Sequence, residues 1–412
     1  IVFGMFLLAS FWIDLRISAY GKAMFDFAVL LQFPLSLVNT LLLPRPEDAV
    51  GLPLVPQYLD WFMQVFANVV VGWATITTLY FAARVYRTNT FLNLGPRRAP
   101  LGLMLWASAA VGCVLIYRLI RPFGVVDWVV RIDSHRSNDL GGSTVGIVAV
   151  FFLSLCALRA YVERRHLLAA IGSIVAVLLF SLYGFRGPVL QFLGTLWLCS
   201  MLLAGSRKRS RRIAVIGGVL LASFFVVFQI YRSATVQVSV DNPLAVIFER
   251  FIGYEVNAKV WSAVASGKFL PTIDFFRGLY EPFVPAGVLG HPRIAPPGFR
   301  IVEAYFGDVR ASSGGISLSI FGELFVFGGI LLQLLVLPIF ALYLWITDTI
   351  IVMTPHDAIL KASLTITTFF LVESPLSQFV WVLFTLAAVA VLFSSSSRSP
   401  RRLTNLPTLQ HN

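Results

Sequence analysis

The chain has 412 residues, of which 58% are hydrophobic and 13% are charged, and it contains 36 phenylalanines. A water-soluble domain of this length needs more polar surface, so the composition excludes the soluble class and indicates a membrane protein. The formal net charge of +12 would suggest nucleic-acid binding in a soluble protein, but a membrane protein gains such an excess from Lys and Arg in its cytoplasmic loops.

Long apolar runs predict an all-α fold, a polytopic transmembrane bundle of about eleven helices, because a spanning helix needs roughly 20 apolar residues. The expected spans are 1–13, 23–43, 61–83, 101–119, 144–161, 167–183, 188–205, 213–230, 320–346, 358–372 and 376–395. The chain begins with Ile1 rather than Met, so we expect the first span to be truncated and a further segment to precede it.

These spans divide the chain into four parts. Residues 1–230 form an N-terminal transmembrane bundle of about eight spans, and residues 231–315 form a large extracytoplasmic loop. Residues 316–395 are C-terminal transmembrane helices, and residues 396–412 are a cytoplasmic tail.

Charge placement predicts which side each loop faces. More than half of the 32 Lys and Arg residues fall in segments 14–22, 84–100, 159–166, 206–212, 347–361 and the tail. The densest cluster is Arg207-Lys208-Arg209-Ser210-Arg211-Arg212, which places its loop in the cytoplasm by the positive-inside rule. The loops between, and the long segment Tyr231–Gly315, are then extracytoplasmic.

The long segment Tyr231–Gly315 is rich in aromatic residues, which a disordered linker would lack. Apolar residues at three- and four-residue spacing predict an amphipathic helix over 243–266. A second short helix is predicted over 270–280. The stretch 281–300 contains five prolines and three glycines, so we expect ordered coil or turns there.

Arginine dominates the basic residues expected at the outer face. Guanidinium groups bind phosphate oxygens bidentately, which suits a pyrophosphate headgroup near the membrane surface. Arg186 stands out because Gly184-Phe185-Arg186-Gly187-Pro188 predicts a tight turn between two spans. The alternative role for each arginine is only to anchor the chain at the membrane interface or to stabilise the loop. The candidate pyrophosphate- or glycan-binding residues are Arg131, Arg136, Arg186, Arg232, Arg250, Tyr254, Arg277, Arg293 and Arg300.

Carboxylates and one histidine of the long loop are candidate general bases for a hydroxyl acceptor. These are Glu255, Glu303 and His291, and the sequence leaves the choice among them open. An ion pair with a neighbouring arginine is the alternative for each carboxylate. No metal-ligand spacing, phosphate-binding loop or dinucleotide fingerprint occurs, so we expect neither a metal nor a cofactor.

Three short motifs carry a resemblance to a known family. They are the Gly-Phe-Arg-Gly-Pro turn at 184–188, Arg250-Phe251-Ile252-Gly253-Tyr254-Glu255 in the long loop, and Phe306-Gly307 leading through Ser312-Ser313-Gly314-Gly315-Ile316 to Gly322-Glu323-Leu324. Together with the hydropathy plan, which covers essentially the whole chain, they resemble the O-antigen polymerases, the oligosaccharide repeat unit polymerases known as Wzy.

The resemblance implies a metal-independent glycosyltransferase of the bacterial inner membrane with its site facing the periplasm. Such enzymes transfer a growing glycan from undecaprenyl pyrophosphate onto an incoming lipid-linked repeat unit. Arg186 and Arg250 would bind the donor pyrophosphate, and Glu255, Glu303 or His291 would be the base. The implied partners are the lipid-linked oligosaccharide, membrane lipid and a chain-length regulator, with no nucleic acid.

Other functions stay open at this point. An O-antigen ligase shares the plan but transfers the finished glycan to a lipid core. A transporter or flippase of lipid-linked sugars usually shows internal repeats and charged residues inside its spans, and here Asp26 is the one acid well within an expected span. A non-catalytic scaffold would not explain the arginines of the long loop.

Overall fold

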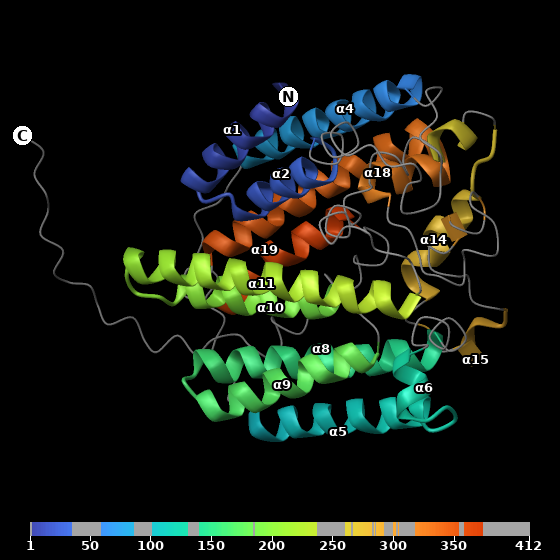
Figure 1. Ribbon diagram of the computed structural model, residues 1–412. Coiled ribbons are helices and arrows are strands. Elements are labelled where there is room, and N and C mark those ends of the chain that lie inside the picture. The colour runs from blue at the N-terminus through green and yellow to red at the C-terminus, as the bar shows by residue number, and fades with distance from the viewer. Residues whose placement is uncertain are drawn as a thin grey trace, which may run out of the picture.

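The computed structural model describes residues 2–34, 59–85, 101–130, 140–183, 186–236, 260–264, 267–281, 284, 286–291, 300–301, 304, 318–353 and 358–373. The regular secondary structure of these residues is helical, which confirms the predicted all-α class for this part of the chain. Figure 1 shows long helices lying roughly side by side, with shorter ones gathered at one end.

The helices follow the expected spans closely. Each expected span from 1–13 to 358–372 overlaps a helix. Of the span expected at 23–43, residues 35–43 lie outside the described residues, as does the whole span expected at 376–395. The helices are α1 (Val2–Arg16), α2 (Tyr20–Gln32), α4 (Leu59–Arg84), α5 (Leu101–Ile120), α6 (Val125–Val130), α8 (Leu140–Val162), α9 (His166–Leu182), α10 (Arg186–Leu202), α11 (Arg207–Val236), α14 (Thr272–Tyr280), α15 (Ala286–Leu289), α18 (Ser319–Met353) and α19 (Ala358–Glu373).

Three of the described helices are long and apolar enough to cross a membrane, over Met63–Arg84, Leu101–Ile120 and Ser319–Val352. Four further helices are apolar but shorter. Large apolar side chains are exposed along the outer faces of the long helices, as at Leu331 on α18 and Leu103 on α5. Such a surface is expected to contact lipid rather than water, so the chain has membrane-protein character.

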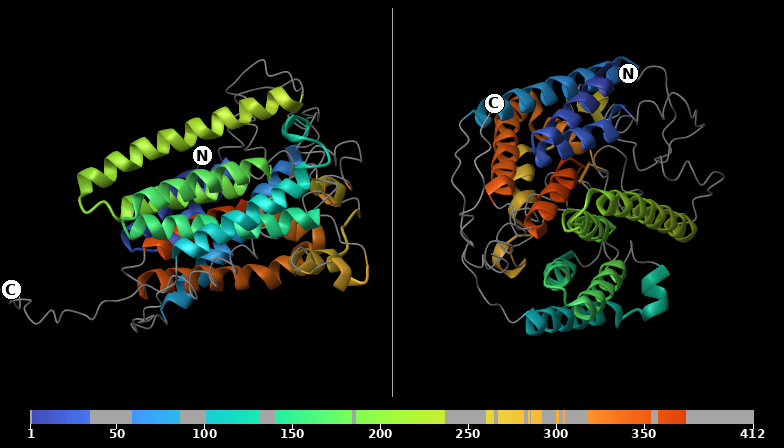
Figure 2. Two further views of the ribbon diagram at one scale, coloured as in Figure 1. Left: turned by 90° about the horizontal axis from the view of Figure 1, so that it is seen from below. Right: turned by 90° about the vertical axis from the view of Figure 1, so that its left-hand side faces the viewer.

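The long helices form two packed groups, each with its own apolar core. One core joins α1, α2, α4 and α18, and the other joins α5, α8, α9 and α10. Helix α19 packs against both α2 and α10 and so connects the groups. The view along the helices in Figure 2 shows the two groups one above the other.

The helix order gives the bundle two distinct ends. The turn between α1 and α2, the end of α4 and the turn between α10 and α11 lie at one end, while α6, α14 and α15 lie at the other (Figure 1). We call these the α11-turn end and the α14 end. The basic cluster at 207–212 lies at the α11-turn end, as the first turns of α11.

A break in α18 anchors the α14 end. Gly329 has φ +60° and ψ −153°, a conformation that disfavours residues with a side chain, and the helix kinks there. Just before the kink, the carbonyl of Val326 accepts a hydrogen bond from the Leu270 N–H at 3.1 Å. The carbonyl of Phe327 accepts one from the Thr272 hydroxyl at 2.7 Å. The segment leading into α14 is therefore fixed to the kink.

Several expected boundaries were wrong, and the differences matter for the site. Segment 206–212 was expected as a loop, but it is helical from Arg207 on, and α11 continues past residue 230 to Val236. The end of α18 was expected near residue 346, but the helix continues to Met353. The short helix expected over 270–280 is confirmed as α14, whereas 281–300, expected as coil, contains α15.

Candidate functional site

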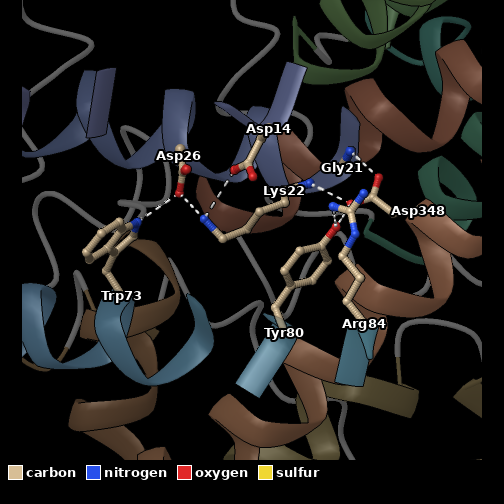
Figure 3. A network of polar contacts seen from close by, with 8 residues as sticks. All are labelled: Asp14, Gly21, Lys22, Asp26, Trp73, Tyr80, Arg84 and Asp348. Carbon is tan, nitrogen blue, oxygen red and sulfur yellow. Dashed lines mark hydrogen bonds and ion pairs between the residues drawn. The ribbon is translucent and has the colours of Figure 1, made fainter. Parts of the chain in front are cut away.

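A cluster of charged side chains is buried between α1, α2, α4 and α18 near the α11-turn end (Figure 3). Lys22, Asp14 and Asp26 are each 0% exposed, and Asp348 is 4% exposed. Charged side chains are rare at such depth because removing them from water costs free energy unless partners compensate. In a bundle of apolar helices, this cluster is therefore a candidate functional site.

Lys22 is the centre of the cluster. Its ammonium lies 2.5 Å from Asp26 Oδ1 on the same helix and 3.6 Å from Asp14 Oδ2 on α1. Trp73 on α4 donates from its indole N–H to the same Asp26 oxygen at 2.8 Å. The ring of Phe25 also lies 5.3 Å from the ammonium nitrogen, close enough for a cation–π contact.

Asp348 occupies a different position, at the N-terminus of α2. Its oxygens accept hydrogen bonds from the backbone N–H groups of Gly21, at 2.6 Å, and Lys22, at 3.2 Å, and from the Tyr80 hydroxyl, at 2.8 Å. A carboxylate at a helix N-terminus is favoured by the unpaired N–H groups there. A Cβ at Gly21 would lie 3.1 Å from Asp348 Oδ1, so glycine allows this close approach.

Arg84 completes this region from the end of α4. It donates to the backbone carbonyl of Ile17 at 2.8 Å and lies 3.4 Å from the Tyr80 hydroxyl. Through these contacts α4 is tied to the turn between α1 and α2 and to α18. Asp348 and its donors therefore fasten the helix ends together.

Sequence reasoning found only Asp26 among these residues. Asp14 and Lys22 fell in an expected loop at 14–22, and Asp348 fell in an expected loop at 347–361. Because the helices extend farther than the apolar runs, all three are helical and buried. The sequence placed only Asp26 within an apolar helix, whereas Asp14, Lys22 and Asp348 are buried in helices as well.

A second charged cluster lies at the α14 end. Arg277 on α14 pairs with Glu281, which is 1% exposed. Its Nη2 lies 2.9 Å from His291 Nδ1. One turn earlier on the same helix, Asp274 accepts a hydrogen bond from Arg300 at 2.8 Å. Three of the predicted site residues, Arg277, His291 and Arg300, are therefore gathered around α14.

The contact with Arg277 bears on the role of His291. A guanidinium only donates, so His291 Nδ1 must accept, and the ring proton of a neutral imidazole then lies on Nε2. Nε2 lies 3.9 Å from Glu281 Oε1, which is too long for a hydrogen bond. In this arrangement His291 has no nitrogen free to accept a proton, so it would have to leave Arg277 to act as a base.

Helix α14 also exposes an apolar stripe. Ile273, Phe276 and Tyr280 follow three- and four-residue spacing and are 61%, 42% and 49% exposed. Phe275, on the opposite side of the helix, is buried against Phe327 of α18. An exposed apolar stripe beside basic residues is typical of a helix that lies in a membrane interface.

The other predicted site residues are placed only in part. Arg186 is the first residue of α10 and Arg232 lies in the last turns of α11, and their side chains are not described. The remaining candidates lie outside the described residues: Glu255, Glu303, Arg131, Arg136, Arg250, Tyr254 and Arg293. Glu281 and Asp274, which pair with Arg277 and Arg300, were not predicted. The four-residue spacing of Arg277 and Glu281 could have indicated their ion pair, because residues so spaced are neighbours on a helix.

Comparison of the chain with protein-family models, with curated proteins and with solved structures gives no match. The resemblance to O-antigen polymerases therefore depends on the short motifs and the hydropathy plan.

Proposed function

We propose that the protein is a membrane glycosyltransferase that polymerises oligosaccharide repeat units carried on undecaprenyl pyrophosphate. The observation that carries the proposal is the α14 cluster. Arg277 lies on the same helix as the exposed stripe of Ile273, Phe276 and Tyr280, and Arg300 is bound to that helix through Asp274. A lipid-linked pyrophosphate has an apolar chain and an anionic headgroup. A basic and apolar surface at one end of the bundle suits both parts of such a molecule.

The distribution of charge supports an orientation for this site. Exposed basic residues are concentrated at the start of α11, at the end of the bundle opposite α14. The positive-inside rule favours placing that end in the cytoplasm. We therefore propose a multi-pass protein of the bacterial inner membrane, with about eleven spans and with α14 in the periplasmic loop.

The proposed reaction needs no external energy source. The hydroxyl of the acceptor repeat unit attacks the anomeric carbon of the donor glycan, a new glycosidic bond forms, and the bond to the pyrophosphate breaks. The pyrophosphate leaves with the electron pair, so its charge grows in the transition state. The guanidinium groups of Arg277 and Arg300 would donate hydrogen bonds to the pyrophosphate and stabilise that charge.

The acceptor proton must pass to a base. Glu255 and Glu303 remain candidates from the sequence. His291 qualifies only if it releases Arg277, and a phosphate that binds the guanidinium would favour that release. The resemblance implies that no metal takes part.

The test uses purified protein in detergent with a lipid-linked repeat unit and no nucleotide. We expect a ladder of lipid-linked oligomers that is formed by the wild type and is lost in Arg277→Ala and Arg300→Ala. Lys208→Ala, which changes an exposed basic residue at the opposite end, is the matched control and should leave the ladder intact. Folded wild-type protein that joins no repeat units would overturn the proposal, and transfer to a lipid core alone would identify a ligase.

One observation favours a second function. The buried charges around Lys22 are the kind of group that transporters place within their spans. A transporter or flippase of lipid-linked sugars leaves its substrate chemically unchanged. If the detergent assay gives no covalent product while the same protein moves lipid-linked sugar across a vesicle membrane, transport is the better account.

A further inference from the structure

The cluster of Asp14, Lys22 and Asp26 contains more hydrogen-bond acceptors than its donors satisfy. Both carboxylate oxygens of Asp14 and Oδ2 of Asp26 are buried without a hydrogen-bond partner. Buried polar atoms in folded proteins are almost always paired. Figure 3 shows the Asp14 carboxylate directed toward the Lys22 ammonium and Asp26. Three unpaired acceptors at one place indicate that a hydrogen-bond donor belongs there.

The charges of the cluster lead to the same conclusion. One ammonium faces two carboxylates, at 2.5 Å and 3.6 Å, so the three side chains together carry one excess negative charge. All three are fully buried, and the ammonium is flanked by the rings of Phe25 and Trp73. An uncompensated charge in such surroundings is strongly destabilising. The Lys22 ammonium already occupies the position between the carboxylates that a metal cation would need.

We propose that Asp14 and Asp26 together bind one exchangeable proton beside the ammonium of Lys22. Both carboxyl groups lie against the same ammonium, Asp26 Oδ1 at 2.5 Å and Asp14 Oδ2 at 3.6 Å. A proton from water adds to an Asp14 oxygen and is donated toward Asp26, which forms a hydrogen bond between a carboxylic acid and a carboxylate. The ammonium, the carboxylate and the acid then sum to zero charge.

The contacts of the two carboxyl groups identify Asp14 as the group that receives the proton. Asp26 Oδ1 accepts hydrogen bonds from Lys22 and Trp73, whereas neither Asp14 oxygen has a hydrogen-bond partner. Asp348 on α18 lies in the same region, but its oxygens accept hydrogen bonds from the backbone of α2 and from Tyr80. On α4, Arg84 is directed to Tyr80 and to the backbone of Ile17. Lys361 lies in the first turn of α19, which packs on α2.

The proton would make the contact between α1 and α2 depend on protonation. With the proton bound, the two helices share a neutral hydrogen-bonded centre. When it leaves, a net negative charge remains between them and the two carboxylates repel each other. The cluster of Asp14, Lys22 and Asp26 lies at the end of the bundle away from α14. It does not rest on the proposed glycan transfer.

Infrared spectroscopy of the purified protein in detergent at neutral pH tests the proposal. A protonated carboxylic acid has a carbonyl stretch above the amide band, and the stretch shifts in heavy water. We expect this band in the difference spectrum between wild type and Asp14→Asn, because asparagine can donate to Asp26 but cannot carry the acid proton. Asp14→Asn should also fold, since its amide imitates the protonated acid.

Asp348→Asn is the matched control. Its oxygens accept three hydrogen bonds and the proposal assigns the proton to Asp14, so the acid band should persist in that variant. Asp26→Asn provides a second test should Asp14→Asn be recovered in low yield, and it should lose the band as well. A band that is absent from the wild type, or unchanged in both Asp14→Asn and Asp26→Asn, would overturn the proposal.

Discussion

The two charged clusters of the bundle are built from similar side chains but lie at different depths. Lys22 and its two aspartates are 0% exposed, whereas the side chains of Arg277 and His291 are 25% and 42% exposed. In the first cluster the charges must be balanced by other protein groups or by a bound proton, because the side chains are fully buried. In the second, solvent or an anionic ligand can replace a protein partner.

This difference in depth predicts different roles. A deeply buried ion cluster holds helices together and reacts strongly to the loss of any member, since each loss leaves an uncompensated charge. The arginines of the second cluster are partly exposed, so solvent can take over part of their contact when an acidic partner is changed, and an anionic ligand can reach them. Mutations in the two clusters should therefore separate stability from substrate binding.

The largest expected effect on stability comes from Lys22→Met. It removes the only cation between two buried carboxylates and should lower the free energy of unfolding by about 3–5 kcal/mol. Thermal unfolding in detergent, followed by intrinsic fluorescence, measures the change. Adding Asp26→Asn to Lys22→Met should recover part of the loss, because it removes one of the stranded charges. Equal stability of Lys22→Met and wild type would show that the buried cluster does not hold the helices.

A smaller effect is expected from Asp348→Asn. The variant weakens the charge-assisted hydrogen bonds from Gly21, Lys22 and Tyr80, and a loss of about 1.5–3 kcal/mol follows. Tyr80→Phe removes only one of these bonds and should cost about 1 kcal/mol. The comparison of the two unfolding midpoints checks the order. A larger loss in Tyr80→Phe would contradict the role given to Asp348 at the start of α2.

The smallest effect is expected at the α14 end, from Glu281→Gln. Glutamine keeps an acceptor for Arg277 at the same buried position, and the guanidinium is 25% exposed, so the loss should be about 1 kcal/mol. The same unfolding assay measures it. A loss as large as that of Lys22→Met would mean that the α14 cluster contributes as much to stability as the buried cluster. The proposed difference between the two clusters would then be wrong.

The helices could be predicted from the sequence, but their ends could not. Apolar runs predicted a helix that overlaps each expected span from 1–13 to 358–372, because side-chain hydropathy is a local property. Asp14 and Asp348 were assigned to loops because a carboxylate ends an apolar run. Their burial depends on contacts with partners far along the chain, such as Gly21 with Asp348, and a single sequence does not show such pairs.

In the α14 cluster, too, the helix could be predicted from the sequence, but the contacts between its side chains could not. Its helix was predicted from spacing, and Arg277, Arg300 and His291 were selected by residue type and by their place in the long loop. Their pairing with Asp274 and Glu281 depends on how the loop folds back onto the kink of α18 at Gly329. The kink itself depends on backbone geometry that glycine permits but does not require.

The measurement that tests the account most directly is the affinity of purified variants for undecaprenyl pyrophosphate in detergent. The ligand carries the apolar chain and the anionic headgroup that the α14 surface is proposed to bind. Arg277→Ala should weaken binding by roughly 30-fold or more, since losing a charged contact to phosphate costs ~2 kcal/mol or more. Asp14→Asn, in the buried cluster, should bind like the wild type. Equal affinity of Arg277→Ala and wild type, or a loss confined to Asp14→Asn, would contradict the division of roles between the two clusters.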